Sequence, residues 1–388
     1  MKREIYLDNS ATTPLCDVAK EKITEAMDIY ANPSSLHAAG QRAHALVEDA
    51  RASLLCALGV RPRQGSFVFT SSGTEASALA IFGVAYAKTR RDARRILTTD
   101  SEHPSVSRAL ERLEKDGFEV VRIPTRGGAL DTDAVAAALD QKILLATFML
   151  VNNETGAIYD VKRAFSLVKT KYPDAVTHCD AVQGFLKIPF TPTSLGADLV
   201  TVSAHKIHAP KGIGGLYIAN DLIKAKKITP FLVGGGQESG MRSGTENTLF
   251  IAAFGAVASD RRARLSEITD KLSSLRAYAE QKIGELEVRV NRPQGEYAPY
   301  ILNITLPNIK SETMLHHLSG EGIYVSSGSA CSSHASHPSE SLLAFGLPRE
   351  EADCSIRISF SEYNTEADVD ALCEGLRSGL ARLVRIKR

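Results

Sequence analysis

Two side chains that could do covalent chemistry together follow two apolar runs of the sequence. Asp180 comes directly after the run 175–179, and Lys206 follows the run 198–202 after a short polar turn. If both runs are strands of one parallel sheet, the two side chains meet in the crevice at the carboxyl ends of the strands. A lysine amine can form a Schiff base with an aldehyde, and a carboxylate can keep a pyridine nitrogen protonated. The pair therefore suggests a site for pyridoxal phosphate, although either residue alone would more often be a cap or a solvated loop residue.

The phosphate of such a cofactor needs a cradle, and the segment 69–75 offers one. It runs from a strand-like stretch into a helix-like stretch and contains Gly73 and Thr74. Gly73 lets the backbone approach an anion closely, a helix N-terminus supplies free N–H groups, and the Thr74 hydroxyl can donate as well. A turn of this kind more often only caps a helix. It gains weight here because it accompanies Asp180 and Lys206.

Arg357 is the one charged residue of the apolar run 356–358. Burying a charge without a partner is too costly, so the pattern leaves two alternatives. Arg357 is either an exposed residue on an edge strand or a clamp for a carboxylate, for which a planar guanidinium is well suited.

Cys331 lies in the segment 326–339, where small polar residues dominate without any apolar period. Such a composition is typical of a mobile loop, and an exposed cysteine on a loop indicates a reactive thiol. Cys331, His334 and His337 also form a C-x2-H-x2-H pattern, but solvated loop histidines are more common than zinc ligands. We therefore predict no metal centre and leave Cys331 as the only point of contact for a metal or an iron–sulfur cluster.

The apolar runs predict the scaffold that must position these residues. Between residues 65 and 219, helix-like stretches alternate with seven short runs, at 66–70, 95–98, 119–123, 142–148, 175–179, 198–202 and 215–218. This alternation is typical of an α/β fold with a mostly parallel sheet covered on both faces. Helical spacing continues from 246 to 286, and strand-like runs follow at 287–290, 301–306, 323–326 and 355–360. We predict a large domain over 15–257 and a small α+β domain, built from 1–14 and 258–388, that carries Cys331 and Arg357.

Composition excludes several classes of function. The 388 residues include 46 Lys plus Arg against 45 Asp plus Glu, a formal net charge of +1. Proteins that bind nucleic acids or membrane surfaces normally show a basic excess, so neither partner is expected. The first residues lack the apolar core of a signal peptide, and no apolar run is long enough to span a bilayer. Six cysteines without a CxxC pair indicate a reducing compartment. We expect a soluble, cytoplasmic protein.

At a larger scale, the chain resembles the fold-type I pyridoxal-phosphate enzymes of the class V aminotransferase group, and within it the cysteine desulfurases of the NifS/IscS kind. The resemblance runs nearly end to end, and its motifs occur in the family's order. They are 6–14, 32–37, 70–75, 102–103, 151–156, 180–183, 203–206, 234–238, 242–245, 327–331 and 355–359.

The resemblance implies a role for each candidate site residue. It implies that Lys206 is the Schiff-base lysine, that Asp180 is the partner of the pyridinium nitrogen and that Gln183 hydrogen-bonds the ring hydroxyl. His103 resembles the imidazole that stacks on the ring and carries protons, although a histidine beside a proline would otherwise be taken for a loop residue. Asn153 resembles a contact to both cofactor and substrate. The residues that resemble phosphate ligands are Gly73, Thr74, Ser203, His205 and Thr245.

Further implications concern partners and the substrate. Thr245 resembles the residue that reaches the phosphate in the partner subunit's site, which implies a homodimer. The family match favours Arg357 as the clamp on the substrate carboxylate, with help from Asn32. The implied activity removes sulfur from L-cysteine, giving L-alanine and a persulfide on Cys331.

The persulfide sulfur would pass to an acceptor such as an iron–sulfur scaffold or a thiolation protein. The resemblance does not say which acceptor is served, and the longer tail by which relatives of the IscS type dock a scaffold is not seen after Arg388. A selenocysteine lyase, a transaminase or another class V enzyme is the alternative with the same cofactor. A non-enzymatic binding module is the third hypothesis.

Overall fold

Seven strands form the largest sheet of the computed structural model, which describes residues 4–61, 63–88, 93–328 and 339–385. Their order across the sheet is β2, β8, β7, β6, β5, β3, β4. Their bounds are β2 (Gly65–Thr70), β3 (Arg95–Thr99), β4 (Glu119–Ile123), β5 (Ile143–Met149), β6 (Val176–Asp180), β7 (Leu199–Ser203) and β8 (Gly214–Ala219). Six strands run in one direction and β8 runs against them, because it pairs antiparallel with both β2 and β7. The mostly parallel seven-stranded sheet expected from the sequence is confirmed.

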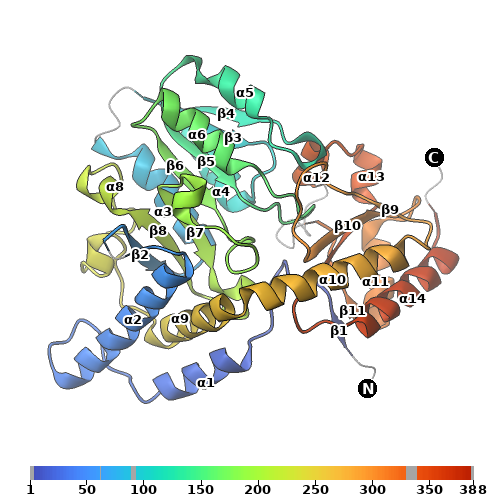
Figure 1. Cartoon of the computed structure of the whole chain (residues 1–388), viewed down its shortest axis with the longest axis horizontal. Coiled ribbons are helices and arrows are strands. Elements are labelled where there is room, and N and C mark those ends of the chain that lie inside the picture. The colour runs from blue at the N-terminus through green and yellow to red at the C-terminus, as the bar shows by residue number, and fades with distance from the viewer. Residues whose placement is uncertain (1–3, 62, 89–92, 329–338, 386–388) are drawn as a thin grey trace.

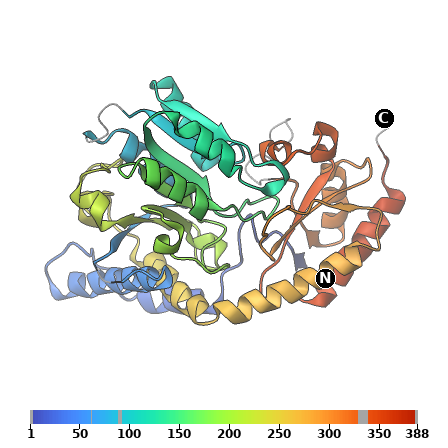
Figure 2. The ribbon, with the colours of Figure 1, turned by 45° about the horizontal axis from the view of Figure 1, so that its top comes forward.

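Helices cover both faces of this sheet (Figures 1 and 2). They are α1 (Asp17–Ala26), α2 (Ala38–Ala57), α3 (Gly73–Ala85), α4 (Pro104–Lys115), α5 (Thr132–Ala137), α6 (Val161–Lys171), α7 (Pro192–Leu195), α8 (Asn220–Lys224) and α9 (Thr248–Ala263). Successive strand residues enter opposite cores: Val68 and Ile96 belong to one apolar cluster, Phe67 and Leu97 to the other. Because side chains alternate across a strand, a sheet covered on both faces needs apolar residues at nearly every position.

A second group of elements lies beside the large sheet (Figure 1). Its antiparallel sheet has the order β12 (Ser355–Ser359), β10 (Ile301–Thr305), β9 (Arg289–Val290), and β1 (Ile5–Tyr6) pairs in parallel with β11 (Ile323–Tyr324). The helices are α10 (Leu265–Ile283), α11 (Ser311–Gly320), α12 (Glu340–Phe345), α13 (Arg349–Asp353) and α14 (Glu366–Arg382). All four strand-like runs predicted for this part are strands, with shorter bounds. The predicted boundary at residue 257 falls inside α9, and the division into two domains stays a prediction.

The N-terminal segment 7–14 joins the two groups. The Asn9 N–H donates to the Ser359 carbonyl at the end of β12, and the Thr13 N–H donates to the His205 carbonyl just after β7. The segment contains Thr12, Thr13 and Pro14 rather than a helical pattern, so its backbone groups are free to bond to two separate sheets. The carboxyl end of β7 is thereby held close to β12.

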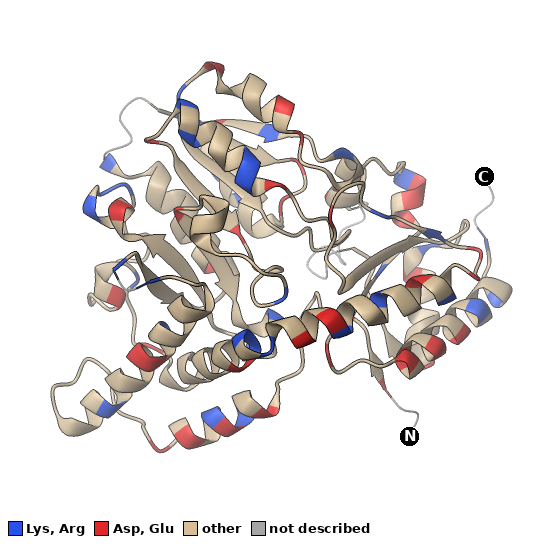
Figure 3. Ribbon diagram, viewed as in Figure 1, with Lys and Arg blue, Asp and Glu red and all other residues tan. Residues whose placement is uncertain are grey.

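Charges are distributed over the surface without segregation by sign. Figure 3 shows acidic and basic side chains interspersed along α1, α10 and α14. Among the residues that the structure describes, no helix is both long enough and apolar enough to cross a membrane. The five cysteines in the described ranges are Cys16, Cys56, Cys179, Cys354 and Cys373, and all are free thiols.

Candidate active site

The predicted site residues converge at the carboxyl edge of the large sheet. Asp180 is the last residue of β6, and Lys206 lies in the helical turn 204–206 that follows the neighbouring parallel strand β7. Both line a cavity of about 170 Å³. The predicted residues that line it are Gly73, Thr74, His103, Asn153, Asp180, Gln183, Ser203, His205, Lys206 and Arg357. The crevice outside the strand ends is where open α/β sheets bind ligands.

Lys206 is held by the N-terminal segment. Its Nζ donates to the carbonyls of Ser10 and Ala11, the second at 2.8 Å. Carbonyl oxygens orient the amine without giving it a counter-charge. Burial lowers the pKa values of His103 and His205, and the charge of the same amine contributes in the same direction, since a cation disfavours a second positive charge nearby.

Asp180 is 6% exposed and accepts a hydrogen bond from the Val182 N–H at 3.0 Å. Burial raises the pKa of its carboxyl to about 6, against the opposing effects of that N–H and of Lys206. Burial makes the ionised form of Asp180 costly, so a cationic partner close to the carboxylate would stabilise that form. A pyridinium N–H is such a partner.

Glu102 lies behind Asp180 and has no counterpart among the roles assigned from the sequence. Its Oε1 accepts from the Thr99 hydroxyl at 2.7 Å and from the Met149 N–H at 2.8 Å, while Oε2 has no partner in the described part of the chain. Burial raises the pKa of Glu102 to about 8, and the charge of Asp180 contributes in the same direction. Glu102 is therefore a neutral acid beside Asp180 at pH 7.

His103 begins α4 as its N-cap. Its Nδ1 accepts from the Ser105 N–H at 3.1 Å and lies 2.8 Å from the Ser105 hydroxyl. Burial lowers the pKa of His103 to about 4, and the positive charges of Lys206 and Arg357 contribute in the same direction. The ring is therefore uncharged at neutral pH, which suits a group that accepts a proton during a reaction.

The cradle predicted at residues 69–75 is present at the start of α3. The Ser72 hydroxyl accepts from the Glu75 N–H and caps the helix. The other N–H groups of a first turn have no acceptor within the helix, so those of Gly73 and Thr74 are suited to an anion. A Cβ on Gly214 would lie 2.5 Å from the Ser72 carbonyl carbon, so only glycine lets β8 approach this turn.

Hydrogen-bond donors without a partner indicate that an anion can bind beside the first turn of α3. The buried hydroxyl of Ser203 lines the cavity and finds no partner among the residues described. A Cβ on Gly73 would come within 3.2 Å of the Ser203 Cβ and would narrow the space between them. His205 lies alongside, with its Nδ1 3.1 Å from the Thr12 hydroxyl. This donor-rich cradle, together with Asp180 and Lys206, fits pyridoxal phosphate.

Gln183 is held from three sides. Its Nε2 donates to the Ser10 carbonyl at 2.9 Å, and its Oε1 accepts from Lys187 at 3.2 Å. Its own carbonyl accepts from the Tyr300 hydroxyl at 2.7 Å. The amide of Gln183 is therefore fixed beside Lys206, because both bond to Ser10.

Arg357 projects from β12 and is only 1% exposed, so the alternative of an exposed edge position is wrong. Nη2 donates to Asp8 at 2.8 Å and Nη1 donates to the Asn153 carbonyl at 2.9 Å. Nε is buried without an acceptor in the ranges that the structure covers. The guanidinium is thus partly neutralised by Asp8 and keeps donor capacity at the cavity that it lines.

Three predicted residues are not placed in this cavity. Asn32 is exposed and its Oδ1 accepts from the Ser34 N–H. Thr245 is exposed and lines a separate hollow beside Thr70 and Ser71. Cys331 lies outside the described residues, as do His334 and His337 of the weighed zinc pattern. No group of three metal-ligating side chains occurs within the described ranges.

Sequence reasoning assigned no role to Asp8, Ser10 or Glu102. All three lie in segments singled out as motifs, 6–14 and 102–103, so a signal was present. It could not be interpreted from the pattern alone, because a polar N-terminal segment and an acidic residue next to a histidine have many ordinary explanations.

The chain is similar to known proteins over nearly its whole length. A family model described as aminotransferase class-V matches residues 5–372. The cysteine desulfurase IscS of Dictyoglomus turgidum is 36% identical, with 99% of this chain and 96% of that protein aligned. The cysteine desulfurase of Trichormus azollae is 38% identical, covering 98% of this chain and 93% of that protein.

Solved structures agree with these relatives. A NifS-like protein superposes with a TM-score of 0.90 at 34% identity, covering 98% of this chain and all of the other. SspA in complex with cysteine superposes with a TM-score of 0.80 at 29% identity, covering 94% of this chain and all of the other. These findings confirm the fold and the family resemblance that the motifs predicted.

The low pKa of His103 predicts a pH-dependent loss of stability. The unfolded chain binds a proton at this residue near pH 6.5 and the folded chain only near pH 4, so acidification favours unfolding between these values. In the apoprotein, His103→Asn keeps an N-cap acceptor and should reduce the fall in unfolding free energy between pH 7 and pH 5 by about 2 kcal/mol. Urea titrations of both proteins at pH 7 and pH 5 measure the free energy of unfolding. If this free energy falls by the same amount in His103→Asn and in the wild type, the pKa of His103 is not lowered by folding.

Proposed function

We propose that this chain, which belongs to the class V aminotransferase family, is a pyridoxal-phosphate-dependent cysteine desulfurase. The observation that supports this proposal most directly is the arrangement of Lys206, Asp180 and Arg357 around one cavity. It combines an amine for the cofactor aldehyde, a carboxylate for its ring nitrogen and a guanidinium for the carboxylate of an amino acid. Relatives named cysteine desulfurase align over almost the full chain and support this choice of reaction.

Different residues of this chain would hold different parts of the cofactor. Lys206 would hold the aldehyde carbon, Asp180 the ring nitrogen and Gln183 the ring hydroxyl, with the His103 imidazole against the ring and Asn153 beside it. The phosphate would lie on Gly73, Thr74, Ser203 and His205. When bound, pyridoxal phosphate supplies an electron sink that stabilises negative charge on the substrate's α-carbon.

Substrate binding and proton transfer follow from the contacts of the site. Arg357 binds the substrate carboxylate with the donors that Asp8 and Asn153 leave available, and its burial strengthens that ion pair. His103 accepts and returns protons because its ring is neutral at pH 7, and the Lys206 amine is the second carrier. Asn32 is proposed to assist at the carboxylate, although it lies outside the cavity of its own chain.

The sulfur leaves the substrate for Cys331. The thiolate attacks the substrate's sulfur, a sulfur–sulfur bond forms and the bond from sulfur to the β-carbon breaks. The electron pair of the broken bond stays with the β-carbon, which takes up a proton. L-Cysteine and the Cys331 thiol thus become L-alanine and a Cys331 persulfide without an external oxidant. A transferable sulfur on Cys331 is then available to an iron–sulfur scaffold or a thiolation acceptor.

Thr245 is proposed to complete the phosphate site of a partner subunit in a homodimer. The loop before it is tied to the phosphate cradle, since Arg242 donates to Glu75 in the first turn of α3 at 2.7 Å. Phe231, Leu232 and Val233 on the same loop are half to three-quarters exposed, a contiguous apolar run that a second subunit would cover. The cysteines within the described ranges are all free thiols, which suits a reducing compartment, and we propose a cytoplasmic location.

Replacing Cys331 by alanine separates cofactor chemistry from sulfur transfer. The variant should bind pyridoxal phosphate with the visible absorption of the wild type, because Lys206 and Asp180 are intact, yet release no sulfide from L-cysteine in the presence of a thiol reductant. Cys56→Ala, which removes an exposed thiol on α2, should keep full activity. Lys206→Ala should bind no cofactor covalently. Sulfide release by Cys331→Ala would refute the role of this thiol.

Assay of L-cysteine against L-selenocysteine discriminates the alternative of a selenocysteine lyase. A desulfurase turns over both, because the carbon–selenium bond is weaker than the carbon–sulfur bond and selenium is attacked more readily by a thiolate. It forms alanine from L-cysteine without any keto acid. Turnover of selenocysteine alone would establish the lyase, and a requirement for a keto acid would establish a transaminase.

Arg357→Lys tests the carboxylate clamp. A lysine keeps the charge but loses the planar fork of donors, so we expect KM for L-cysteine to rise about tenfold to a hundredfold, since hydrogen bonds to a charged group are worth about 1.5–3 kcal/mol. The spectrum of the bound cofactor should stay unchanged. Steady-state kinetics give KM and kcat separately. An unchanged KM with a fall in kcat alone would show that Arg357 does not hold the substrate carboxylate.

Co-expression tests whether Thr245 acts across subunits. Thr245→Val removes the hydroxyl and should weaken cofactor binding, while Lys206→Ala abolishes catalysis. A mixed dimer of the two variants contains one site with both Lys206 and Thr245 intact, so activity per bound cofactor should return. Tagged mixed dimers isolated by two affinity steps provide the measurement. If the mixed dimer remains as weak as its parents, Thr245 serves its own subunit or no site at all.

A further inference from the structure

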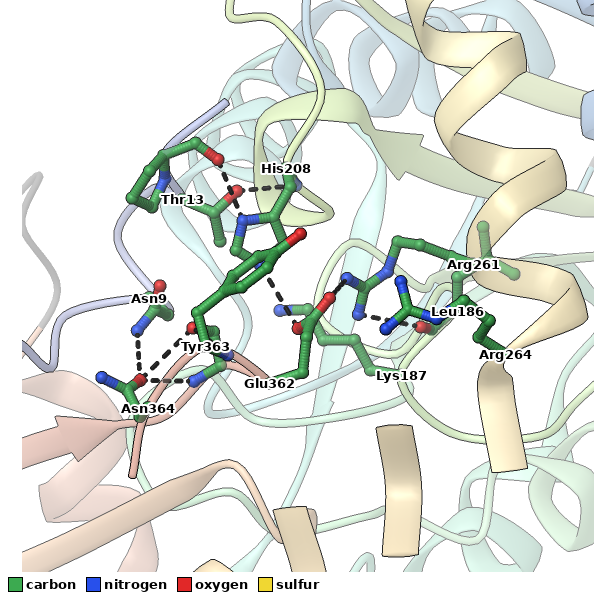
Figure 4. A network of polar contacts seen from close by, with 12 residues as sticks. Asn9, Thr13, Leu186, Lys187, His208, Arg261, Arg264, Glu362, Tyr363 and Asn364 are labelled. Carbon is green, nitrogen blue, oxygen red and sulfur yellow. Dashed lines mark hydrogen bonds and ion pairs between the residues drawn. The ribbon is translucent and has the colours of Figure 1, made fainter. Parts of the chain in front are cut away.

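A buried ionic cluster that the proposed mechanism does not use lies behind the cavity, and Figure 4 shows it from close by. Its centre is Glu362, three residues beyond β12, whose side chain is 5% exposed. Arg261 of α9 donates to one carboxylate oxygen, and the His208 Nε2 lies 3.4 Å from the other. Burial by itself would raise the pKa of Glu362, but the hydrogen bond from His208 and the charge of Arg261 lower it to about 2. Glu362 is therefore an anion over the whole working range of pH.

His208 connects Glu362 to the turn of Lys206. Its N–H donates to the Thr13 hydroxyl at 2.7 Å, and its Nδ1 lies 2.9 Å from the Pro14 carbonyl. It adopts a positive φ of 67°, a conformation that is uncommon for residues other than glycine, although histidine adopts it more often than most. Contacts at both ring nitrogens hold the residue there, and the position of Lys206, two residues earlier, depends on the same turn.

Arg261 connects Glu362 to the turn of Gln183. Its Nη2 donates to the Leu186 carbonyl at 3.5 Å, and Leu186 also has a positive φ, of 53°. The next residue, Lys187, is buried and donates to the Gln183 Oε1 at 3.2 Å. Burial lowers the pKa of Lys187 well below its usual value, and the negative charge of Glu362 opposes that shift.

We propose that Glu362 is a positioning residue for the cofactor site, because this one carboxylate fastens the turn after Lys206 and the turn after Gln183 to each other. The proposal rests on the function proposed above. Each turn contains a residue with a positive φ, His208 or Leu186. Glu362 contacts the first turn through His208 and the second through Arg261. The cluster therefore sets where the Lys206 amine and the Gln183 amide lie, without touching substrate or cofactor.

The same carboxylate also sets the electrostatic potential at the back of the site. The charged or titratable groups around it are His208, Arg261, Arg264, Lys187 and Tyr363. Arg261 and Arg264 are the cations of this set, although Arg264 also pairs with Asp260 and Glu267. Lys206 and Arg357 lie close enough to affect Lys187 as well. Asp180, His103 and His205 also face the Lys206 amine. Removing the charge of Glu362 would take one anion away from the back of the site, which disfavours the protonated form of the Lys206 nitrogen.

Glu362→Gln in the holoenzyme tests the proposal. The pH midpoint of the visible absorption band of the lysine-bound cofactor should move down by about half a pH unit, and the dissociation constant for pyridoxal phosphate should rise about threefold to tenfold. The matched control is Glu280→Gln, because Glu280 lies on α10 away from the cavity and also accepts from two arginines, Arg276 and Arg292. The control should lose thermal stability while its midpoint and its cofactor affinity stay at wild-type values.

His208→Asn gives a second variant in case Glu362→Gln folds poorly. Asparagine tolerates the positive φ at this position and leaves the pair of Arg261 and Glu362 intact, so it removes the ring contacts of His208 to Glu362 and to the Pro14 carbonyl. We expect weaker cofactor binding in the same direction, together with a lower thermal stability, because one buried oxygen of Glu362 loses its partner. Spectral midpoints and cofactor affinities equal to those of the wild type in both variants would overturn the proposal. A wild-type protein that binds no pyridoxal phosphate would overturn the proposed function itself and this inference with it.

Discussion

The attachment of segment 7–14 to both sheets is the constraint on which the site depends. Hydrogen bonds from Asn9 to Ser359 and from Thr13 to His205 hold the end of β12 against the turn that follows β7. Arg357 lies on β12, and Lys206 lies in the turn that follows β7. Their side chains share one cavity because a short extended segment, with backbone groups to spare, bonds to two sheets at once. The carbonyls of Ser10 and Ala11, in the middle of that segment, then orient the amine.

Burial gives the cavity its chemical character. Desolvation keeps His103 neutral and raises the pKa of Glu102 to about 8, so Asp180 is the main negative charge of the cavity at neutral pH. Donors without a partner among the described residues are left instead, at the Ser203 hydroxyl and at Nε of Arg357. The N–H groups of the first turn of α3 add to them. These donors favour the binding of two anionic groups in the cavity. The phosphate of the cofactor and the carboxylate of an amino acid are two such groups.

The buried charges outside the cavity follow a different rule. Glu362 is surrounded by Arg261 and His208, and Glu238 by Arg51 and the Phe69 N–H. A carboxylate desolvated in this way is tolerated only when its partners are fixed, so each cluster joins segments that are distant in sequence. One joins the elements behind Lys206 and Gln183. The other attaches the loop that presents Thr245 to α2 and β2.

The sequence by itself determined the sheet and the chemistry of its edge. Alternating runs predict parallel strands, and parallel strands bring their carboxyl ends together, so the order of the runs was enough to place Asp180 and Lys206 in one crevice. Helical spacing and the Ser72–Gly73 turn likewise identified the anion cradle. These features are local, or follow from topology rules that hold for nearly all such folds.

Only the tertiary structure decided contacts between segments far apart in the chain. Arg357 could equally have been an exposed edge residue, and its burial depends on Asp8, some 350 positions earlier. Glu362 carried no signal in the sequence, because its partners come from α9 and from the turn after β7. No periodicity encodes such pairs. They arise when chain folding closes long loops and places a charge where water is excluded, so its partner is known only once the packing is known.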